Sequence, residues 1–256
     1  MDITVILTGY RRGHTLEEQY QAIIGQSLPP KEILLWYNYP GQEPINFDVG
    51  HKMATAFCNY NFGVWSRFAF ALMAKNEYVC IFDDDTIPGR RFLENCYNTI
   101  QECNGLLGTC GVSYPNPFPA DDERSSYYMA HIKPGWMNPN EETVQVDFIG
   151  HSWFFRKEWL SDYWREQPNP KYNICGEDMH FSYMLQKYRG LGTYVPPHPA
   201  NDRELWGSLK KEYTIDQFSI HETNAPTITG VPMMTATNEF FVEQRKKGWK
   251  LLNDPT

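Results

Sequence analysis

Three consecutive aspartates, Asp83, Asp84 and Asp85, directly follow the apolar run 78–82. Adjacent like charges are unfavourable unless something compensates them, and divalent cations prefer oxygen ligands. Because side chains alternate along an extended chain, Asp83 and Asp85 should point to one side and Asp84 to the other. The triplet could instead form an acidic turn ahead of Pro88. Its place directly after an uninterrupted apolar run favours a metal site.

A second acidic pair, Glu177 and Asp178, follows Gly176 and opens a segment with apolar residues at helical spacing. The helix dipole stabilises carboxylates in the first turn of a helix, so capping alone could explain the pair. A carboxylate can also act as a general base, provided that it reaches the proton that it removes. The pair is therefore a candidate for acid–base chemistry.

Segment 144–155, between the two acidic groups, combines strand-like alternation with a glycine, Gly150. Glycine within a strand is typical of a close approach between backbone and ligand. Asp147, His151 and Trp153 are our candidates for contact with a sugar or an acceptor, with the indole as a stacking platform. Burial in the core is the alternative for Trp153.

The elements that must position these residues alternate between strands and helices. A strand, a helix and a second strand within the first 37 residues predict a βαβ unit and an α/β fold with a mostly parallel sheet. Ligands of such sheets bind outside the carboxyl ends of the strands, where the triplet falls. We predict strands at 2–8, 32–37, 78–82, 106–113, 144–155 and 192–195, and helices at 61–75, 91–102, 157–164, 177–188 and 238–250, with a further helix begun by a capping box of Thr15 and Glu18.

Composition limits the classes of partner. The 256 residues carry a net charge of −8, and 15% of them are aromatic. An acidic surface repels a phosphate backbone, so we expect no nucleic-acid partner. A phosphorylated small molecule can still bind if a divalent cation supplies positive charge. The aromatic residues suit either a core or stacking on sugars.

The cysteine pattern and the hydropathy bear on location. The six cysteines form no C-x-x-C pair, which predicts reduced thiols and a cytoplasmic protein. Met1 leads directly into the first predicted strand, and no apolar run approaches membrane-spanning length. We therefore expect neither a signal peptide nor a transmembrane helix. A peripheral membrane contact remains compatible with the sequence.

The order of these motifs resembles the GT-A fold of nucleotide-sugar glycosyltransferases of the family-2 type. Segment 5–12 resembles the first strand and loop that receive the nucleotide, and helix 63–74 with Arg67 resembles the element before the metal-binding strand. The aspartate triplet resembles the DXD motif, and Gly-Glu-Asp resembles the later acidic motif of that family. The resemblance extends over residues 3–195 and implies a Rossmann-like mixed, mostly parallel sheet flanked by helices.

The resemblance also implies roles for individual residues. Asp85, with Asp83, would ligate Mn²⁺ or Mg²⁺ beside the donor diphosphate. Asp178 would be the base that deprotonates the acceptor hydroxyl, and Glu177 would orient the acceptor. Some GT-A enzymes use a C-terminal histidine as a further ligand, for which His198 or His221 is the candidate. The residues expected to contact the donor are Thr8, Tyr10, Arg11, Arg67, Asp83 and Asp84.

The implied organisation is one catalytic domain with an extension. Residues 1–195 would form the GT-A domain, with a nucleotide-binding half at 1–113 and an acceptor and catalytic half at 114–195. The extension 196–256 would pack on the same domain, and its segment 200–207 could close over the donor as a lid.

The implied activity is transfer of a sugar, with inversion, from a nucleotide-diphosphate sugar, most often UDP-linked, to a hydroxyl of a glycan or glycolipid. A retaining exostosin-like transferase is the nearest alternative. A sugar nucleotidyltransferase would need a glycine-rich basic loop, whereas Tyr10-Arg-Arg-Gly13 has one glycine. A non-catalytic carbohydrate-binding protein would leave Glu177 and Asp178 without a role.

Overall fold

The computed structural model describes residues 2–10, 12–38, 53–114, 131–135, 138–214 and 233–255. Ten strands are formed by these residues, and their places in the sequence account for the predicted α/β class. The strands are β1 (Ile3–Gly9), β2 (Glu32–Asn38), β3 (Ala54–Cys58), β4 (Tyr78–Phe82), β5 (Leu106–Leu107), β6 (Cys110–Val112), β7 (Val144–Val146), β8 (Phe148–Gly150), β9 (Ser152–Arg156) and β10 (Thr193–Val195).

Eight of the strands form one mixed sheet in the order β3-β2-β1-β4-β9-β5-β10-β7, and β6 pairs with β8 separately. Strands β1 to β4 run parallel, so their carboxyl ends meet at one edge. Strand β9 is antiparallel to β4, with Ser152 opposite Phe82. The start of β9 therefore lies at the same edge as the end of β4.

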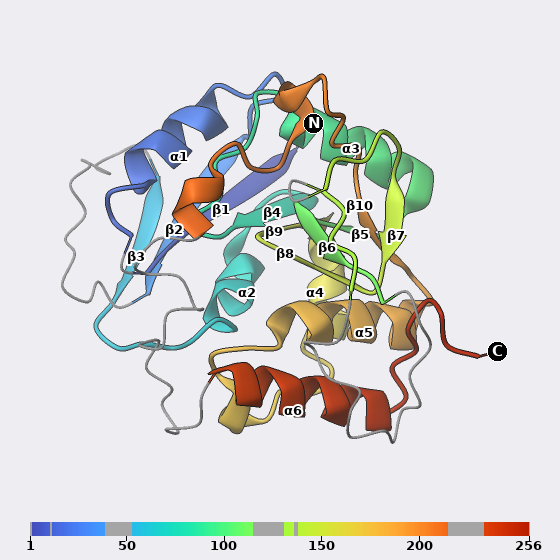
Figure 1. Cartoon of the computed structure of the whole chain (residues 1–256). Coiled ribbons are helices and arrows are strands. Elements are labelled where there is room, and N and C mark those ends of the chain that lie inside the picture. Colours follow the sequence, from blue (N-terminus) through green and yellow to red (C-terminus); the bar gives the residue numbers. More distant parts are fainter. Residues whose placement is uncertain are drawn as a thin grey trace.

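Helices cover both faces of the large sheet (Figure 1). On one face lie α1 (Leu16–Ile24) and α3 (Phe92–Cys103). On the other lie α2 (Ser66–Phe70), α4 (Leu160–Tyr163) and α5 (Glu177–Arg189), and α6 (Met233–Lys246) packs outside α5. Short 3₁₀ turns complete the described elements: η1 (Ala71–Met73), η2 (Lys157–Trp159), η3 (Pro170–Tyr172), η4 (Arg203–Leu205) and η5 (Lys211–Thr214).

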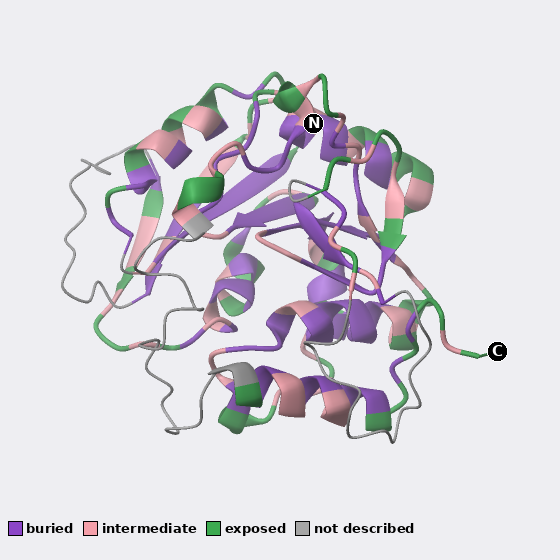
Figure 2. Ribbon diagram, viewed as in Figure 1, coloured by how far each residue is buried: buried purple, intermediate pink, exposed green. Residues whose placement is uncertain are grey.

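The core lies along the central strands. Every residue of β1 and of β4 is buried, as expected for strands covered on both faces (Figure 2). Much of the aromatic content fills the layer between the sheet and α2, α4 and α5. There the rings of Phe68 and Tyr163 stack 4.7 Å apart, and Trp153 meets Phe68 edge-on. The high aromatic share thus serves packing to a large extent.

Several predicted elements differ in detail. Segment 144–155 forms three short strands, because a reversal at His151 separates β8 from β9. Strand β3 was not predicted, and α6 begins at Met233, five residues before the expected start at 238. The prediction of a capping box is wrong, because the Thr15 side chain makes no hydrogen bond to the helix N-terminus.

The segment 200–207 is held against the start of α3. The backbone N–H of Gly89 donates to the carbonyl of Trp206 at 2.8 Å, and that of Arg91 donates to Glu204 at 2.7 Å. Trp206 itself is 6% exposed. Any closure over a donor would have to break these contacts.

All six cysteines are free, and burial raises the pKa of the Cys110 and Cys175 thiols to about 12. None of the helices in the described ranges has both the length and the apolar character needed to cross a bilayer.

Candidate active site

Three segments distant in sequence meet at the carboxyl edge of the sheet. They are the end of β4, the corner between β8 and β9, and the start of α5. The backbone N–H of Asp83 donates to the carbonyl of His151 at 3.0 Å, which joins the first two segments. The buried guanidinium of Arg67 on α2 joins the first and the third, because it contacts both Asp83 and Glu177.

Asp83, Asp85 and His151 form a group that could hold a metal ion, with one ligand atom from each lying within 4.8 Å of the others. The Nδ1 atom of His151 is 3.4 Å from Oδ1 of Asp85. Burial opposes the charge on each partner, yet their mutual attraction lowers the pKa of Asp85 and raises that of His151. Two carboxylates and an imidazole are a donor set that suits a divalent cation. His151, expected to contact a sugar or acceptor, therefore lies in the predicted metal site.

Asp84 points away from this group, as the alternation of an extended chain predicts. Its carboxylate accepts hydrogen bonds from the Arg12 side chain at 2.9 Å and from the backbone N–H of Tyr10 at 3.0 Å. Burial raises the pKa of Asp84 to about 7, although the positive charge of Arg12 acts against this. Asp84 thus anchors the loop after β1, and Arg12 is its buried partner.

Gln19 of α1 and Thr15, the residue directly before α1, hold the backbone of the aspartate triplet. The amide of Gln19 donates to the carbonyls of Asp83 at 2.7 Å and Thr86 at 2.8 Å. The hydroxyl of Thr15 lies 2.7 Å from the carbonyl oxygen of Asp84. These contacts explain why Thr15 does not cap its helix. The spacing of Thr15 and Gln19, one helical turn apart, was the signal that sequence reasoning missed.

Arg67 is the electrostatic centre of the site. Only 7% of the residue is exposed, and its two terminal nitrogens contact Asp83 and Glu177 separately. Its guanidinium also lies 4.4 Å from the ring centroid of Trp153. Burial alone would lower the pKa of Arg67, but the two carboxylates raise it. Arg67 therefore stays charged and fixes the position of both acids.

Glu177 and Asp178 are presented by the left-handed residue that precedes them. Gly176 has φ of 87°, and a Cβ there would lie 2.6 Å from the ring of Phe240 on α6. Glycine is needed for both reasons. Burial and the charge of Glu177 raise the pKa of Asp178, while Glu177 itself is held by Arg67. The carboxylate of Asp178 accepts the backbone N–H of Met179 at 2.7 Å.

Three sequence-predicted site residues are buried in structural roles. His198 is fully buried, with Nδ1 bonded to the carbonyl of Pro196 and Nε2 accepting the N–H of Gly207, so the prediction of a metal ligand is wrong. Trp153 is 1% exposed and lies behind Arg67, which excludes a stacking platform for a sugar.

Asp147 is the third of these residues. Its two carboxylate oxygens accept the backbone N–H groups of Tyr114 and Leu252 at 2.9 and 2.7 Å, and the residue is 5% exposed. Asp147 thus ties the C-terminal segment to the sheet and does not face a ligand.

Of the remaining residues predicted to contact the donor, the structure describes Thr8 and Tyr10. Thr8 is nearly buried and donates to the carbonyl of Phe82 at 2.8 Å, which links β1 to β4. The hydroxyl of Tyr10 accepts the amide of Asn61 at 3.2 Å, beside the end of β1. Arg11 and His221 lie outside the described residues.

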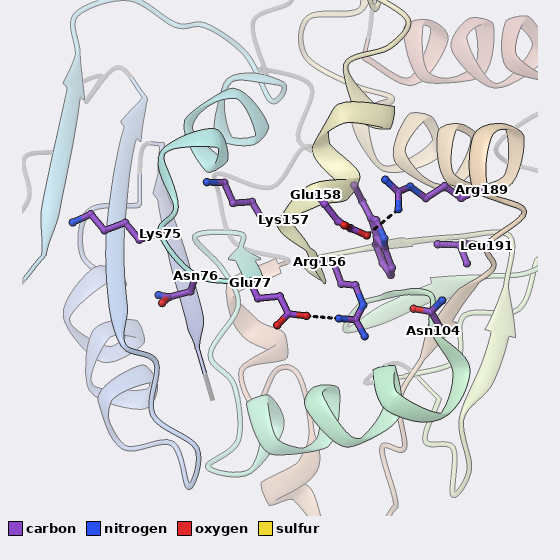
Figure 3. Close-up of a pocket in the computed structure, with 10 residues that line it drawn as sticks. Lys75, Asn76, Glu77, Asn104, Arg156, Lys157, Glu158, Arg189 and Leu191 are labelled. Carbon is purple, nitrogen blue, oxygen red and sulfur yellow. Dashed lines mark hydrogen bonds and ion pairs between the residues drawn. The ribbon is translucent and has the colours of Figure 1, made fainter.

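A pocket of about 890 Å³ lies at the other end of β4 (Figure 3). Its wall includes Glu77 and Arg156, which pair with one another, and Glu158 and Arg189, which form a second pair. Because these four charges are paired with one another, the pocket offers a weaker case for chemistry than the edge that bears Asp83.

Solved structures of S. aureus TarS share this fold. TarS residues 1–349 with UDP match with a TM-score of 0.53 and 15% identity over 77% of this chain and 58% of that chain. The complex with UDP-GlcNAc matches with a TM-score of 0.51 and 14% identity, over 80% of this chain and 60% of that chain. A longer TarS structure matches with a TM-score of 0.52 and 16% identity, over 77% of this chain and 37% of that chain. This chain thus spans less than two thirds of the TarS chains. The match confirms the GT-A fold that the sequence predicted.

The sequence itself matches no protein-family model and no curated protein.

Proposed function

We propose that this chain is a metal-dependent glycosyltransferase. It would transfer a sugar from a nucleoside-diphosphate sugar to a hydroxyl of a glycan or glycolipid acceptor, with inversion at the anomeric carbon. The observation that carries the proposal is the meeting of a metal-ligand group and a separate acidic pair at one sheet edge, joined through Arg67. A binding module has no need of the second acid.

The donor half of the proposal follows from charge. The protein is acidic, so an anionic diphosphate needs a positive partner. Asp83 and Asp85 would hold Mn²⁺ or Mg²⁺, which would offset charge on the diphosphate and on the departing nucleotide. Arg67 cannot take this part, because its two ends are occupied by Asp83 and Glu177.

The acceptor half rests on Asp178. It is only half-buried, whereas Glu177 beside it is 7% exposed and ion-paired. Burial and the neighbouring charge raise the pKa of Asp178, and a carboxylate with a raised pKa is a stronger base once it has lost its proton. Asp178 would remove the proton of the acceptor hydroxyl, and Glu177, held in place by Arg67, would orient the acceptor.

UDP is the donor nucleotide that we propose. The fold is shared with TarS, which has been solved in complex with UDP and with UDP-GlcNAc. UDP is also the most frequent carrier in the family that the sequence resembles. The half-buried and buried residues at the end of β1, including Thr8 and Tyr10, would line the nucleotide side.

A thermal-shift screen tests the donor half. UDP, GDP and dTDP would each be added with Mn²⁺, with Mg²⁺ and with EDTA. A ligand that binds only the folded state raises the melting temperature, so UDP with a metal should give the largest rise. Asp85→Asn should abolish it. The absence of any shift with every nucleotide would contradict the proposal.

Turnover tests the acceptor half. Asp178→Asn should lower the rate of sugar transfer by about 10²–10⁴-fold, the usual contribution of a general base, with UDP binding unchanged. Glu158→Gln is the matched control, since Glu158 is an exposed carboxylate beside the remote pocket. Retention of full turnover in Asp178→Asn would remove Asp178 from the mechanism. NMR of the anomeric carbon of the product would separate inversion from retention.

A further inference from the structure

His151 occupies an unusual backbone position beside the aspartate triplet. Its φ of 66° lies in the left-handed region, which disfavours residues with a side chain. Its carbonyl accepts the backbone N–H of Asp83 at 3.0 Å and the hydroxyl of Thr86 at 3.0 Å. The corner that bears His151 is therefore fixed to the end of β4 on both sides of Asp84 and Asp85.

We propose that Nδ1 of His151 is a direct ligand of the divalent metal, together with Asp83 and Asp85. The metal site would then prefer Mn²⁺ to Mg²⁺. This inference rests on the proposed function, because it concerns the cation that the donor diphosphate would share. It takes the place of His198, since both ring nitrogens of that residue are already bonded to the backbone.

The geometry suits shared coordination better than a hydrogen bond. The distance between His151 Nδ1 and Asp85 Oδ1 is 3.4 Å, which is long for a hydrogen bond. Two ligand atoms about 2.1 Å from one cation and at right angles are about 3.0 Å apart. The three ligand atoms, all within 4.8 Å of one another, could close on one ion through small side-chain rotations.

The second oxygen of Asp83 makes the arrangement compatible with Arg67. Arg67 contacts Oδ1 of Asp83 through one terminal nitrogen. A carboxylate can accept at both oxygens, so Asp83 can contact the guanidinium and a cation together. Arg67 would hold Asp83 in place for the metal, as a hydrogen-bonded outer partner commonly does for a ligand.

An imidazole ligand changes which metal binds. Mg²⁺ is held mainly by oxygen and gives up its water reluctantly, whereas imidazole nitrogen suits transition metals. A site with two carboxylates alone would discriminate little between Mg²⁺ and Mn²⁺. Adding the nitrogen of His151 should favour Mn²⁺, and removing it should weaken Mn²⁺ binding much more than Mg²⁺ binding.

The test is electron spin-echo spectroscopy of Mn²⁺ bound to the protein, with and without UDP. A coordinated histidine nitrogen adds ¹⁴N modulation to the Mn²⁺ echo, and labelling the histidines with ¹⁵N alters it. The variant is His151→Asn, because asparagine tolerates the left-handed backbone but lacks the imidazole. Circular dichroism and the melting temperature check that the variant folds. Isothermal titration gives the Mn²⁺ and Mg²⁺ affinities.

We expect ¹⁴N modulation in the wild type and its loss in His151→Asn. The substitution should also raise the Mn²⁺ dissociation constant about tenfold or more, which corresponds to a loss of about 1.4 kcal/mol of binding free energy. The Mg²⁺ dissociation constant should change far less. If Mn²⁺ binds and Asp85→Asn abolishes it, but the wild-type echo lacks ¹⁴N modulation, His151 is not a ligand while the proposed metal site stands. If Mn²⁺ does not bind even with UDP, the metal-dependent function fails as well.

Discussion

Replacement of Arg67 by methionine is the sharpest test of how the site is built. Methionine keeps much of the side-chain length but removes the charge and all five N–H donors. Asp83 and Glu177 would then face one another and Asp178 without a cation. The ring of Trp153 would also lose the guanidinium that lies 4.4 Å from its centroid.

The expected loss is large. Removing one partner of a buried ion pair lowers the free energy of unfolding by about 3–5 kcal/mol, a substantial part of the total of about 5–15 kcal/mol for a domain. The loss should depend on pH. Burial already raises the pKa of Glu177, and the charge of Arg67 is the main influence that lowers it. Without Arg67 this pKa rises further. An acid whose pKa is raised on folding adds stability at low pH that disappears as the pH increases, so the variant should lose more at pH 8 than at pH 5.5.

Urea unfolding at both pH values measures the effect. Arg203→Met is the matched control, because Arg203 is exposed and lies over the ring of Trp206, so its loss should stay within about 0.5 kcal/mol. The double variant Arg67→Met/Glu177→Gln should recover part of the stability, since one uncompensated charge is gone. A loss below about 1 kcal/mol in Arg67→Met, or an equal loss at both pH values, would refute this reasoning.

Three further predictions concern stability. Gly176→Ala should lower the free energy of unfolding by roughly 2 kcal/mol or more in a thermal or urea melt, because φ is 87° and the new Cβ would meet Phe240 at 2.6 Å; an unchanged melt would contradict the assigned backbone. Burial lowers the pKa of His198 to about 4, while the unfolded chain takes up this proton near pH 6.5, so stability should fall by up to about 3 kcal/mol as the pH drops between these values. His198→Gln should flatten that part of a pH series of urea titrations, and an identical slope would exclude His198 as its source. Asp147→Asn should lower the free energy of unfolding by about 1–2 kcal/mol and speed amide exchange at Leu252, because the backbone N–H of Leu252 loses a charged acceptor. Amide protection at Leu252 equal to that of the wild type would argue against this anchor.

The sequence predicts the fold well where local signals are strong. The apolar runs of β1 and β4 are fully buried strands, and that of β2 is a partly buried strand. The acidic residues after β4 fall at the carboxyl edge as expected for parallel strands. The opposite directions of Asp83 and Asp84 follow from the alternation of an extended chain, and the contacts of both agree with it.

Residue roles that depend on distant partners were harder to predict. Nothing local distinguishes His151, a metal-site neighbour, from His198, a core histidine, since the difference is set by which strands pair with which. Trp153 has the composition of a sugar platform, but its place behind Arg67 is fixed by packing on α2. Asp147 looked like a site acid because the C-terminal segment that occupies it lies more than a hundred residues later.

The position of β9 has a consequence for the order in which the chain can fold during synthesis. Strands β1 to β4 can pair as soon as the first 82 residues have left the ribosome. Strand β4 consists of apolar and aromatic residues, and its other edge receives a partner only when Ser152–Arg156 has been made. An open apolar edge is a template for pairing with other chains. Nascent chains stalled between these points should aggregate unless a chaperone covers that edge, and ribosome-bound fragments ending before and after β9 would differ most in this respect.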